Sequence, residues 1–221
     1  MYQRDYIMRL IEQFGQALQR ILGVKEAKQF DAALHEISQA GKTLLGLDMT
    51  LLRALDDRQI VDFLTTSDGL DSGRCLVTAE LFLQEGEITA LLGEAEESIR
   101  NYSKSLSLFL SALDENKQLH NETYFSKVED LRKRLSAFPL PGHVTFKLYR
   151  YFEQLGYYAK AEDLLFALLA IGYPGITEEG RAFFVRLLAL RDAALQQGNL
   201  PRTEVLEGQA DFEKRLLAAK A

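Results

Sequence analysis

The stretch from Ala79 to Leu110 constrains the fold of this chain more than any other segment. Small and aromatic residues recur there at the spacing of a closely packed helix pair: Gly86, Gly93, Ser98, Tyr102 and Ser105. Two antiparallel helices approach tightly only where small side chains face each other, with an aromatic ring filling the space beside them. The pattern therefore predicts two helices in close contact, joined by a turn at Gly93.

The rest of the chain also shows apolar residues at helical spacing, and strand-like alternation is absent. Leu and Ala dominate and only four prolines occur, which favours an all-α fold. Gly23 is expected to end the first helix, Asp48 and Asp56 to begin the two short ones, and Thr177 to cap the tenth. Residues 65–73 are expected to form a loop. The expected helices span residues 2–22, 26–45, 49–54, 57–66, 72–92, 94–113, 122–137, 143–155, 157–171, 178–197 and 201–219.

The length of 221 residues fits one elongated domain over residues 1–221. Two segments interrupt the helical pattern enough to be sub-boundaries. Glycine, serine and aspartate crowd residues 67–73, and two prolines lie in residues 138–142.

The small–apolar–small arrangement occurs in three places: Ala33/Ile37/Ala40, Ser98/Tyr102/Ser105 and Ala161/Leu165/Leu168. A glycine also precedes Ser98, Ala161 and Thr203 by the same distance. In these features the chain resembles tetratricopeptide-like helical repeats over about two-thirds of its length. The resemblance implies irregular antiparallel helix pairs stacked as an α-α superhelix. The chain departs from the regular pattern because it has no Trp and its units recur at unequal separations, all longer than about 34 residues.

A second resemblance lies at the start of the chain. The opening MYQRDYIMRLIEQFG and the Leu-Gly-Leu-Asp segment after the second expected helix are similar to a family of uncharacterised, mostly Gram-positive bacterial proteins. That resemblance implies a fold and a bacterial source, and it supplies no activity and no site residues.

Charge and cysteine usage exclude several classes of function. The net charge is −6 and the isoelectric point is near 5.2, and the nearest approach to a basic cluster is Arg132-Lys133-Arg134. Nucleic acids and anionic membranes are bound by clustered Lys and Arg, so neither is an expected partner. One cysteine, no signal-peptide pattern and no apolar run of about 20 residues predict a cytoplasmic protein.

No catalytic, metal-binding or cofactor-binding set of residues stands out. His35, His120 and His143 lie far apart and form no zinc-binding pattern, and Cys75 has no identifiable base as a partner. The glycines follow no phosphate-binding motif, and residues 67–73 lack the ligand spacing of a calcium loop. We therefore expect a protein that is not an enzyme and has no cofactor.

The repeat resemblance implies that the first helix of each pair lines a concave face. In the central pair this face would carry Glu80, Leu83, Glu87, Ala90 and Leu91. In the next pair it would carry His143, Phe146, Arg150, Glu153 and Gln154, and in the last Val185, Leu188, Asp192, Leu195 and Gln196. A groove that mixes apolar and charged side chains suits an extended peptide or a partner helix. The apolar members can equally pack against inserted helices.

These patterns lead to one main hypothesis, a non-enzymatic adaptor that binds a protein or peptide along the concave face. The residues chosen for that face are Glu80, Leu83, Glu87, His143, Phe146, Arg150, Glu153, Gln154 and Asp192.

Two alternatives stay open. The first is a self-associating homodimer, suggested by the wide apolar face of the N-terminal helix: Ile7, Leu10, Ile11, Phe14, Leu18 and Ile21. The second is a small-molecule or enzymatic site around one helix and its aromatic cluster: His143, Tyr149, Arg150 and Glu153.

Overall fold

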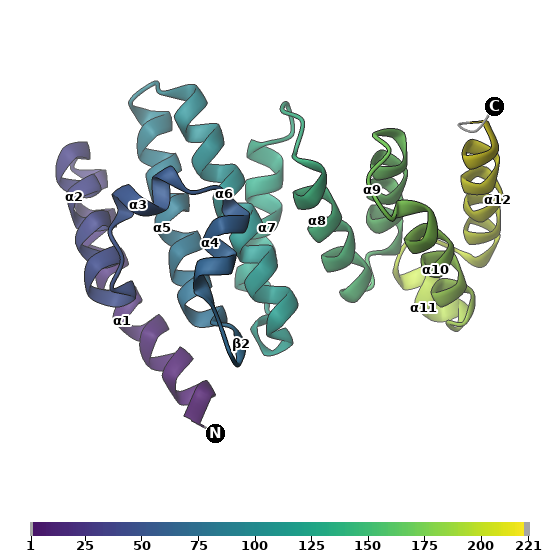
Figure 1. The fold of residues 1–221 in the computed structure, drawn as a ribbon, viewed down its shortest axis with the longest axis horizontal. Helices are drawn as coiled ribbons and strands as arrows, with labels where there is room; N and C mark the ends of the chain where they lie inside the picture. The colour runs from purple at the N-terminus through teal and green to yellow at the C-terminus, as the bar shows by residue number, and fades with distance from the viewer. Residues whose placement is uncertain (1, 219–221) are drawn as a thin grey trace. The chain divides into compact units, whose positions relative to one another are not determined.

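The computed structural model describes the backbone of residues 2–218 and the side chains of residues 6–218. The chain divides into two compact units, unit 1 (Met1–Pro139) and unit 2 (Leu140–Ala221). Within the described residues, α-helices account for nearly all regular structure, so the expected all-α fold is confirmed (Figure 1). The division falls inside the 138–142 segment, whereas the 67–73 segment lies within unit 1. The single elongated domain stays a prediction.

Unit 1 is built around one long helix pair. Helices α5 and α6 pack against each other, α1 and α2 pack against α5, and α7 packs against α6 (Figure 1). The shorter α4 contacts both α5 and α6. The elements in chain order are α1 (Tyr2–Glu26), α2 (Phe30–Ala40), the π-helix η1 (Gly41–Leu45), α3 (Met49–Ala54), α4 (Asp57–Leu64), β1 (Thr65–Thr66), β2 (Gly69–Leu70), α5 (Ser72–Leu91), α6 (Ala95–Glu115), the 3₁₀ turn η2 (Lys117–Leu119) and α7 (Glu122–Arg134).

The α5–α6 contact uses the small and aromatic residues that the sequence pattern singled out. Gly86 meets the ring of Tyr102 so closely that a β-carbon on the glycine would lie 2.7 Å from Cδ1 of the ring. Ser98 and Ser105 are buried, and the Ser105 hydroxyl donates to the carbonyl of Ala79 at 2.8 Å. Gly93 adopts φ +82° and turns the chain between the two helices. The predicted close helix pair is therefore present.

Unit 2 contains shorter helices arranged as neighbouring pairs. Helix α8 packs against α9, and α10 packs against both α9 and α12. Gly180 of α10 repeats the close approach seen in unit 1, because a β-carbon there would lie 2.1 Å from Cζ of Phe212 in α12. The elements are α8 (Gly142–Gln154), α9 (Tyr158–Ala170), α10 (Ile176–Leu188), α11 (Asp192–Gln197) and α12 (Arg202–Ala218).

The structure corrects the expected helix ends in unit 1. Gly23 does not end α1, which continues to Glu26, and the chain turns at Lys28, whose φ is +58°. The next helix begins at Phe30 and continues past Ala40 as the π-helix η1. Residues 65–70 form a short antiparallel hairpin, not a loop, with Thr65 opposite Leu70. The expected caps Asp48 and Asp56 are confirmed, and Asp56 forms a reciprocal capping box with Gln59.

The expected helix over residues 178–197 is wrong, because the chain there forms two helices, α10 and α11. The guanidinium of Arg202 donates to the carbonyls of Leu188 at 2.9 Å and Leu190 at 2.5 Å, which satisfies the backbone where α10 ends. Thr177 is not the cap of α10, which begins after Gly175 in a left-handed conformation. The end expected at residue 219 lies outside the described residues.

Among residues 2–218, no helix has both the length and the apolar character that crossing a membrane requires.

Candidate functional site

The residues expected to form a groove in the central pair are largely covered. Glu80 and Leu83 are 5% and 7% exposed, because α1, α2 and α7 surround α5. Glu80 forms an ion pair with Lys127 of α7. Burial raises the pKa of Glu80, and the charge of Lys127 opposes that shift. Glu80 and Leu83 therefore do not line an open groove.

Glu87 is only half-buried, but its carboxylate is already engaged from both sides. The ammonium of Lys25 in α1 lies 2.5 Å from Oε2, and the guanidinium of Arg134 in α7 lies 3.3 Å from Oε1. Arg134 also donates to the Tyr102 hydroxyl at 3.1 Å. Glu87 therefore joins α1, α5 and α7. Only Ala90 and Leu91 of this predicted set are exposed, at the end of α5.

The α8 set behaves differently, because its side chains share polar contacts with those of α10. We define the α8–α10 face by six residues on these two helices: Phe146, Tyr149, Arg150, Glu153, Glu179 and Arg186. Three of them, Phe146, Arg150 and Glu153, are predicted from the sequence for the concave face, and Tyr149 is predicted for the alternative small-molecule site. Their spacing along α8 places them on successive turns of one helix face.

Arg186 is the centre of the α8–α10 face. Its guanidinium donates two hydrogen bonds to Glu153, at 2.7 Å and 3.0 Å, and a third to Glu179 at 2.7 Å. It also donates to the Tyr149 hydroxyl at 3.0 Å, and that hydroxyl donates to Glu179 at 2.7 Å. Arg150 lies at the edge of the network, with a nitrogen 3.8 Å from Glu179. The two carboxylates and the two guanidinium groups of the α8–α10 face therefore give it a net charge of zero.

Aromatic rings surround Tyr149, a member of this network. Tyr149 is fully buried, and its ring meets Phe183 of α10 edge-on at 5.6 Å between centroids. Phe146 stacks on Tyr173 at 5.4 Å and remains half-buried. His143 is also half-buried, one turn before Phe146.

The pKa shifts of Tyr149 and Arg186 determine the protonation states of these two groups. Burial raises the pKa of Tyr149, and the charge of Glu153 and the hydrogen bond to Glu179 act in the same direction. The hydrogen bond to Glu153 raises the pKa of Arg186. The phenol therefore stays neutral and the guanidinium stays charged at neutral pH. These groups can bind and orient a partner, but neither exchanges a proton near pH 7.

Sequence reasoning missed Glu179 and Arg186 as members of this face. They stand seven residues apart on α10, two helical turns, which is a detectable same-face signal. The sequence pattern predicts one longer helix over residues 178–197, and the face predicted for that helix begins at Val185 and excludes both residues.

The residues predicted for the concave face of the last helix pair are not part of the α8–α10 face. Asp192 begins α11 and accepts a hydrogen bond from Arg202 at 2.5 Å, which holds the start of α12 beside the α10–α11 break. Leu195 is fully buried, Val185 is 63% exposed and Gln196 is exposed. Gln154 ends α8 and is half-buried.

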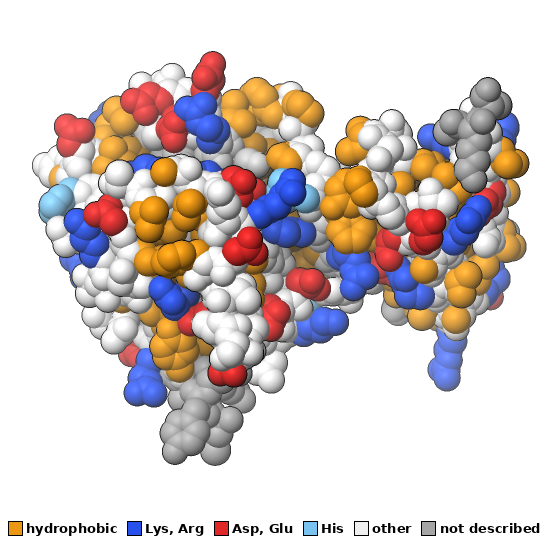
Figure 2. All heavy atoms as spheres, in the orientation of Figure 1, with side chains coloured by type: hydrophobic (Ala, Val, Ile, Leu, Met, Phe, Trp, Pro, Cys, Tyr) orange, Lys and Arg blue, Asp and Glu red, His pale blue; other side chains and the backbone are white. Residues whose placement is uncertain are grey.

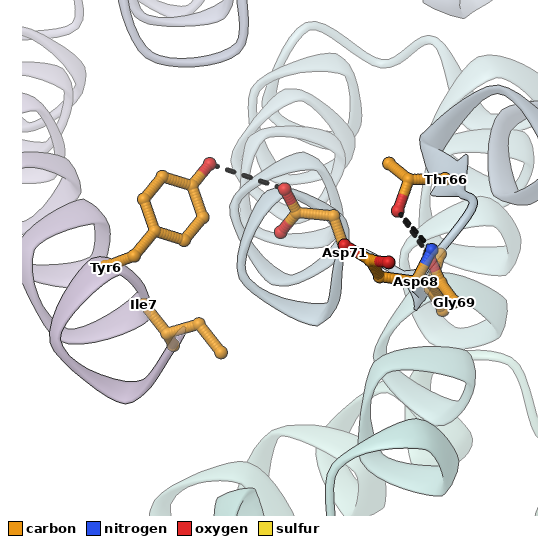
Figure 3. Close-up of a pocket in the computed structure, with 7 residues that line it drawn as sticks. Tyr6, Ile7, Thr66, Asp68, Gly69 and Asp71 are labelled. Atoms are coloured by element: carbon orange, nitrogen blue, oxygen red, sulfur yellow. Dashed lines mark hydrogen bonds between the residues drawn. The ribbon is translucent and has the colours of Figure 1, made fainter. Parts of the chain in front are cut away.

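A cavity of about 350 Å³ lies in unit 1 between the start of α1 and the hairpin (Figure 3). The Tyr6 hydroxyl points across it and donates to Asp71 at 3.3 Å, and Asp71 also caps α5 by accepting from the amide of Arg74. The Thr66 hydroxyl closes the hairpin turn by donating to the Gly69 carbonyl at 3.1 Å. Capping and turn formation account for these polar groups.

The fold and the α8–α10 face define an all-α protein of paired helices with a charged, partly exposed face. The chain belongs to a family of unknown function (DUF6483), whose family model matches residues 1–216. This membership agrees with the expected uncharacterised family. Neither the comparison with curated proteins nor that with solved structures finds a match.

Proposed function

We propose that this chain is a non-enzymatic adaptor of irregular tetratricopeptide-like helix pairs, and that its α8–α10 face binds a segment of a partner protein. The observation that carries the proposal is the network across α8 and α10, which are the first helices of two successive pairs. In stacked helix pairs the first helices line the binding surface. Arg186 of α10 joins the two helices through Glu153 and Tyr149 of α8.

Arg150 is the group we expect to anchor the partner. Its side chain is 42% exposed and its contact with Glu179, at 3.8 Å, is longer than those of Arg186. A carboxylate of the partner can therefore approach the guanidinium without breaking a short hydrogen bond. Arginine beside aromatic rings is a common composition of binding hot spots, and Phe146 stacked on Tyr173 supplies those rings.

The chemistry of the face favours binding over catalysis. The pKa shifts of Tyr149 and Arg186 move both groups away from neutrality, so neither is suited to act as a general acid or base. We place this adaptor in the cytoplasm of a bacterium, since its single cysteine, Cys75, is buried and fits a reducing compartment.

Affinity capture from a bacterial lysate, followed by calorimetry with the purified partner, tests the proposal. Arg150→Glu and Phe146→Ala should each weaken binding by about tenfold or more, the usual effect of truncating a hot-spot residue. Lys214→Glu is the matched control, because it reverses one charge on an exposed side chain of α12 outside this face. If both test variants bind the partner as well as the control does, the assignment of the face is wrong.

The alternative, a self-associating homodimer, is tested separately. Most residues that suggested a dimer are buried inside unit 1: Ile7, Leu10, Phe14 and Ile21. Packing of α1 against α2 and α5 therefore accounts for that apolar face. Light scattering over a concentration series measures the oligomeric state, and a stable dimer would restore the alternative.

A further inference from the structure

An apolar surface lies beside Arg150 on the α8–α10 face. Phe146 stacks on Tyr173, with 5.4 Å between the ring centroids and 21° between the ring planes. Ile171, which directly follows α9, is an exposed hydrophobic residue. We call Phe146, Ile171 and Tyr173 the apolar platform. On the side of unit 2 that Figure 2 shows, hydrophobic side chains gather over α8 and α9, beside Lys and Arg side chains.

Gly142, the first residue of α8, lets the platform lie against this helix. A β-carbon at Gly142 would lie 2.8 Å from Cδ2 of Tyr173 and 3.2 Å from Cδ1 of Ile171. Both side chains are therefore in close contact with the start of α8. Gly142, Phe146 and Arg150 follow one another at intervals of four residues. The platform and the guanidinium of Arg150 therefore occupy successive turns of one helix face.

The guanidinium groups of the α8–α10 face are more exposed than its carboxylates. The side chains of Arg150 and Arg186 are each 42% exposed, whereas those of Glu179 and Glu153 are 21% and 14% exposed. The four charges sum to zero, but a partner that approaches from solvent meets the positive groups first. This arrangement favours an acidic partner and opposes a basic one.

Arg150 can bind both oxygens of a partner carboxylate. Its contact with Glu179, at 3.8 Å, is an ion pair that is too long for a hydrogen bond. A guanidinium carries N–H donors in a planar arrangement that matches the two oxygens of a carboxylate. A partner carboxylate can therefore accept two parallel hydrogen bonds from Arg150, while Glu179 keeps its hydrogen bonds from Arg186 and Tyr149.

The spacing between the apolar platform and Arg150 fits an extended segment. Residues four positions apart in a helix, such as Phe146 and Arg150, are separated by a rise of about 6 Å. In an extended chain, side chains two positions apart point to the same face and lie about 6.6 Å apart. Neighbouring residues of such a chain point to opposite faces, so they cannot reach both groups.

We propose, as a consequence of the proposed function, that the α8–α10 face recognises an extended acidic segment of the partner. In this segment an apolar residue and an Asp or Glu stand two positions apart. The apolar side chain covers the apolar platform, and the carboxylate binds Arg150. A segment with Lys or Arg in place of the acidic residue is rejected, because it brings a like charge against Arg150.

Fluorescence polarisation of labelled peptides with the full chain tests this proposal. Two probes carry Phe and Glu two positions apart in either order: Gly-Ser-Gly-Phe-Gly-Glu-Gly-Ser-Gly and Gly-Ser-Gly-Glu-Gly-Phe-Gly-Ser-Gly. The one that binds more tightly is the reference probe. Matched probes carry Gln or Lys in place of Glu, or place Phe and Glu next to each other. The reference probe should bind about tenfold more tightly than the Gln probe, the usual value of a hydrogen bond between charged groups, and more tightly than all the others.

Variants assign the recognition to named residues. Arg150→Gln should bind the Glu and Gln probes equally, because it removes the charge that distinguishes them. Ile171→Ser should weaken the binding of the Phe-containing probes several-fold, because it removes apolar area from the platform. Leu206→Ser is the matched control for Ile171→Ser, since Leu206 is an exposed residue of α12 outside the α8–α10 face.

Four results would overturn this proposal. They are no binding of any probe at millimolar concentration, equal affinity of the parent for the Glu and Gln probes, a preference for Glu that Arg150→Gln retains, and an effect of Ile171→Ser no larger than that of Leu206→Ser. If one of these results is found while Arg150→Glu and Phe146→Ala still weaken binding of the partner captured from the lysate, the face binds a partner of other chemistry and the proposed function stands. If binding of that partner is also unaffected, both proposals are wrong.

Discussion

Gly86 and Tyr102 touch so closely that a β-carbon on the glycine would lie 2.7 Å from one ring carbon and 2.8 Å from the next. The β-carbon of Asn101 would lie 3.3 Å from the added carbon. A hydrogen atom is therefore all that fits at Gly86, and this contact sets how closely α5 and α6 pack.

Gly86→Ala should lower the free energy of unfolding by about 2 kcal/mol, because the methyl group must displace a buried ring. The intrinsic preference of alanine for helices, about 1 kcal/mol, opposes this loss but does not cancel it. Gly23→Ala is the control, since Gly23 lies inside α1 with nothing within 4 Å of the added carbon. Urea denaturation should show Gly23→Ala gaining about 0.5–1 kcal/mol. If the free energy of unfolding rose for both variants, Gly86 would not be in close contact with Tyr102.

The α5–α6 pair was predictable because its signal is local: small and aromatic residues at fixed spacing inside two uninterrupted helices. The ends of other helices were not predictable in this way. The break between α10 and α11 is stabilised by Arg202, which binds the carbonyls of Leu188 and Leu190 from beyond the break. A local pattern carries no information about such a partner.

Only the α8 residues of the α8–α10 face were predictable from the sequence. Arg150 and Glu153 follow from the helical spacing of α8, but Glu179 and Arg186 join them through tertiary packing. In the central pair the same spacing selected Glu80 and Leu83, which neighbouring helices cover. Helical periodicity identifies residues that share a face, and it does not reveal whether that face is open.

The turn after α1 supplies a prediction about backbone conformation. Lys28 holds φ at +58°, a left-handed conformation that costs a residue with a β-carbon about 1 kcal/mol or more. Lys28→Gly should therefore raise the free energy of unfolding by about 0.5–1 kcal/mol. Asn199→Gly, at φ +56°, should gain less, because asparagine tolerates this region. Thermal unfolding of both variants measures the difference, and equal gains would contradict this account.

Two arginines of α10 form a matched pair for testing the network of the α8–α10 face. Arg186 donates two hydrogen bonds to Glu153 and also bonds Glu179 and Tyr149, whereas Arg181 donates two hydrogen bonds to Glu213, at 2.7 Å and 2.9 Å. The Glu153 side chain is 14% exposed and the Glu213 side chain is 41% exposed.

Arg186→Met should lower the free energy of unfolding by about 2–3 kcal/mol, because it removes the arginine bonded to the poorly solvated Glu153 and leaves Glu179 only the more distant Arg150. Arg181→Met should cost less than about 1 kcal/mol, the usual value of an exposed ion pair. Guanidinium denaturation at fixed pH compares the two variants. Similar losses would mean that the network contributes no more than an ordinary surface pair.

Glu162 predicts how the stability of unit 2 changes with pH. Its carboxylate on α9 lies against Gly208 of α12, where a β-carbon would be 2.0 Å from Oε1, and that oxygen has no hydrogen-bond partner. Burial raises the pKa of Glu162 to about 7, and the charges of Asp163, Glu204 and Asp211 add to the shift. The folded protein therefore keeps a proton that the unfolded chain releases above pH 4.5.

Because the folded state binds this proton more tightly, the contribution of Glu162 to stability falls as pH rises from about 4.5 to about 7 and is then constant. The side chain is partly exposed, so we expect a loss of about 1 kcal/mol over this range. Glu162→Gln should remove it: the variant should gain about 1 kcal/mol more, relative to the parent, at pH 8 than at pH 4. Urea denaturation of the parent and of Glu162→Gln at pH 4 and pH 8 measures this difference, and a Glu162→Gln difference that does not change with pH would show that Glu162 does not titrate in this range.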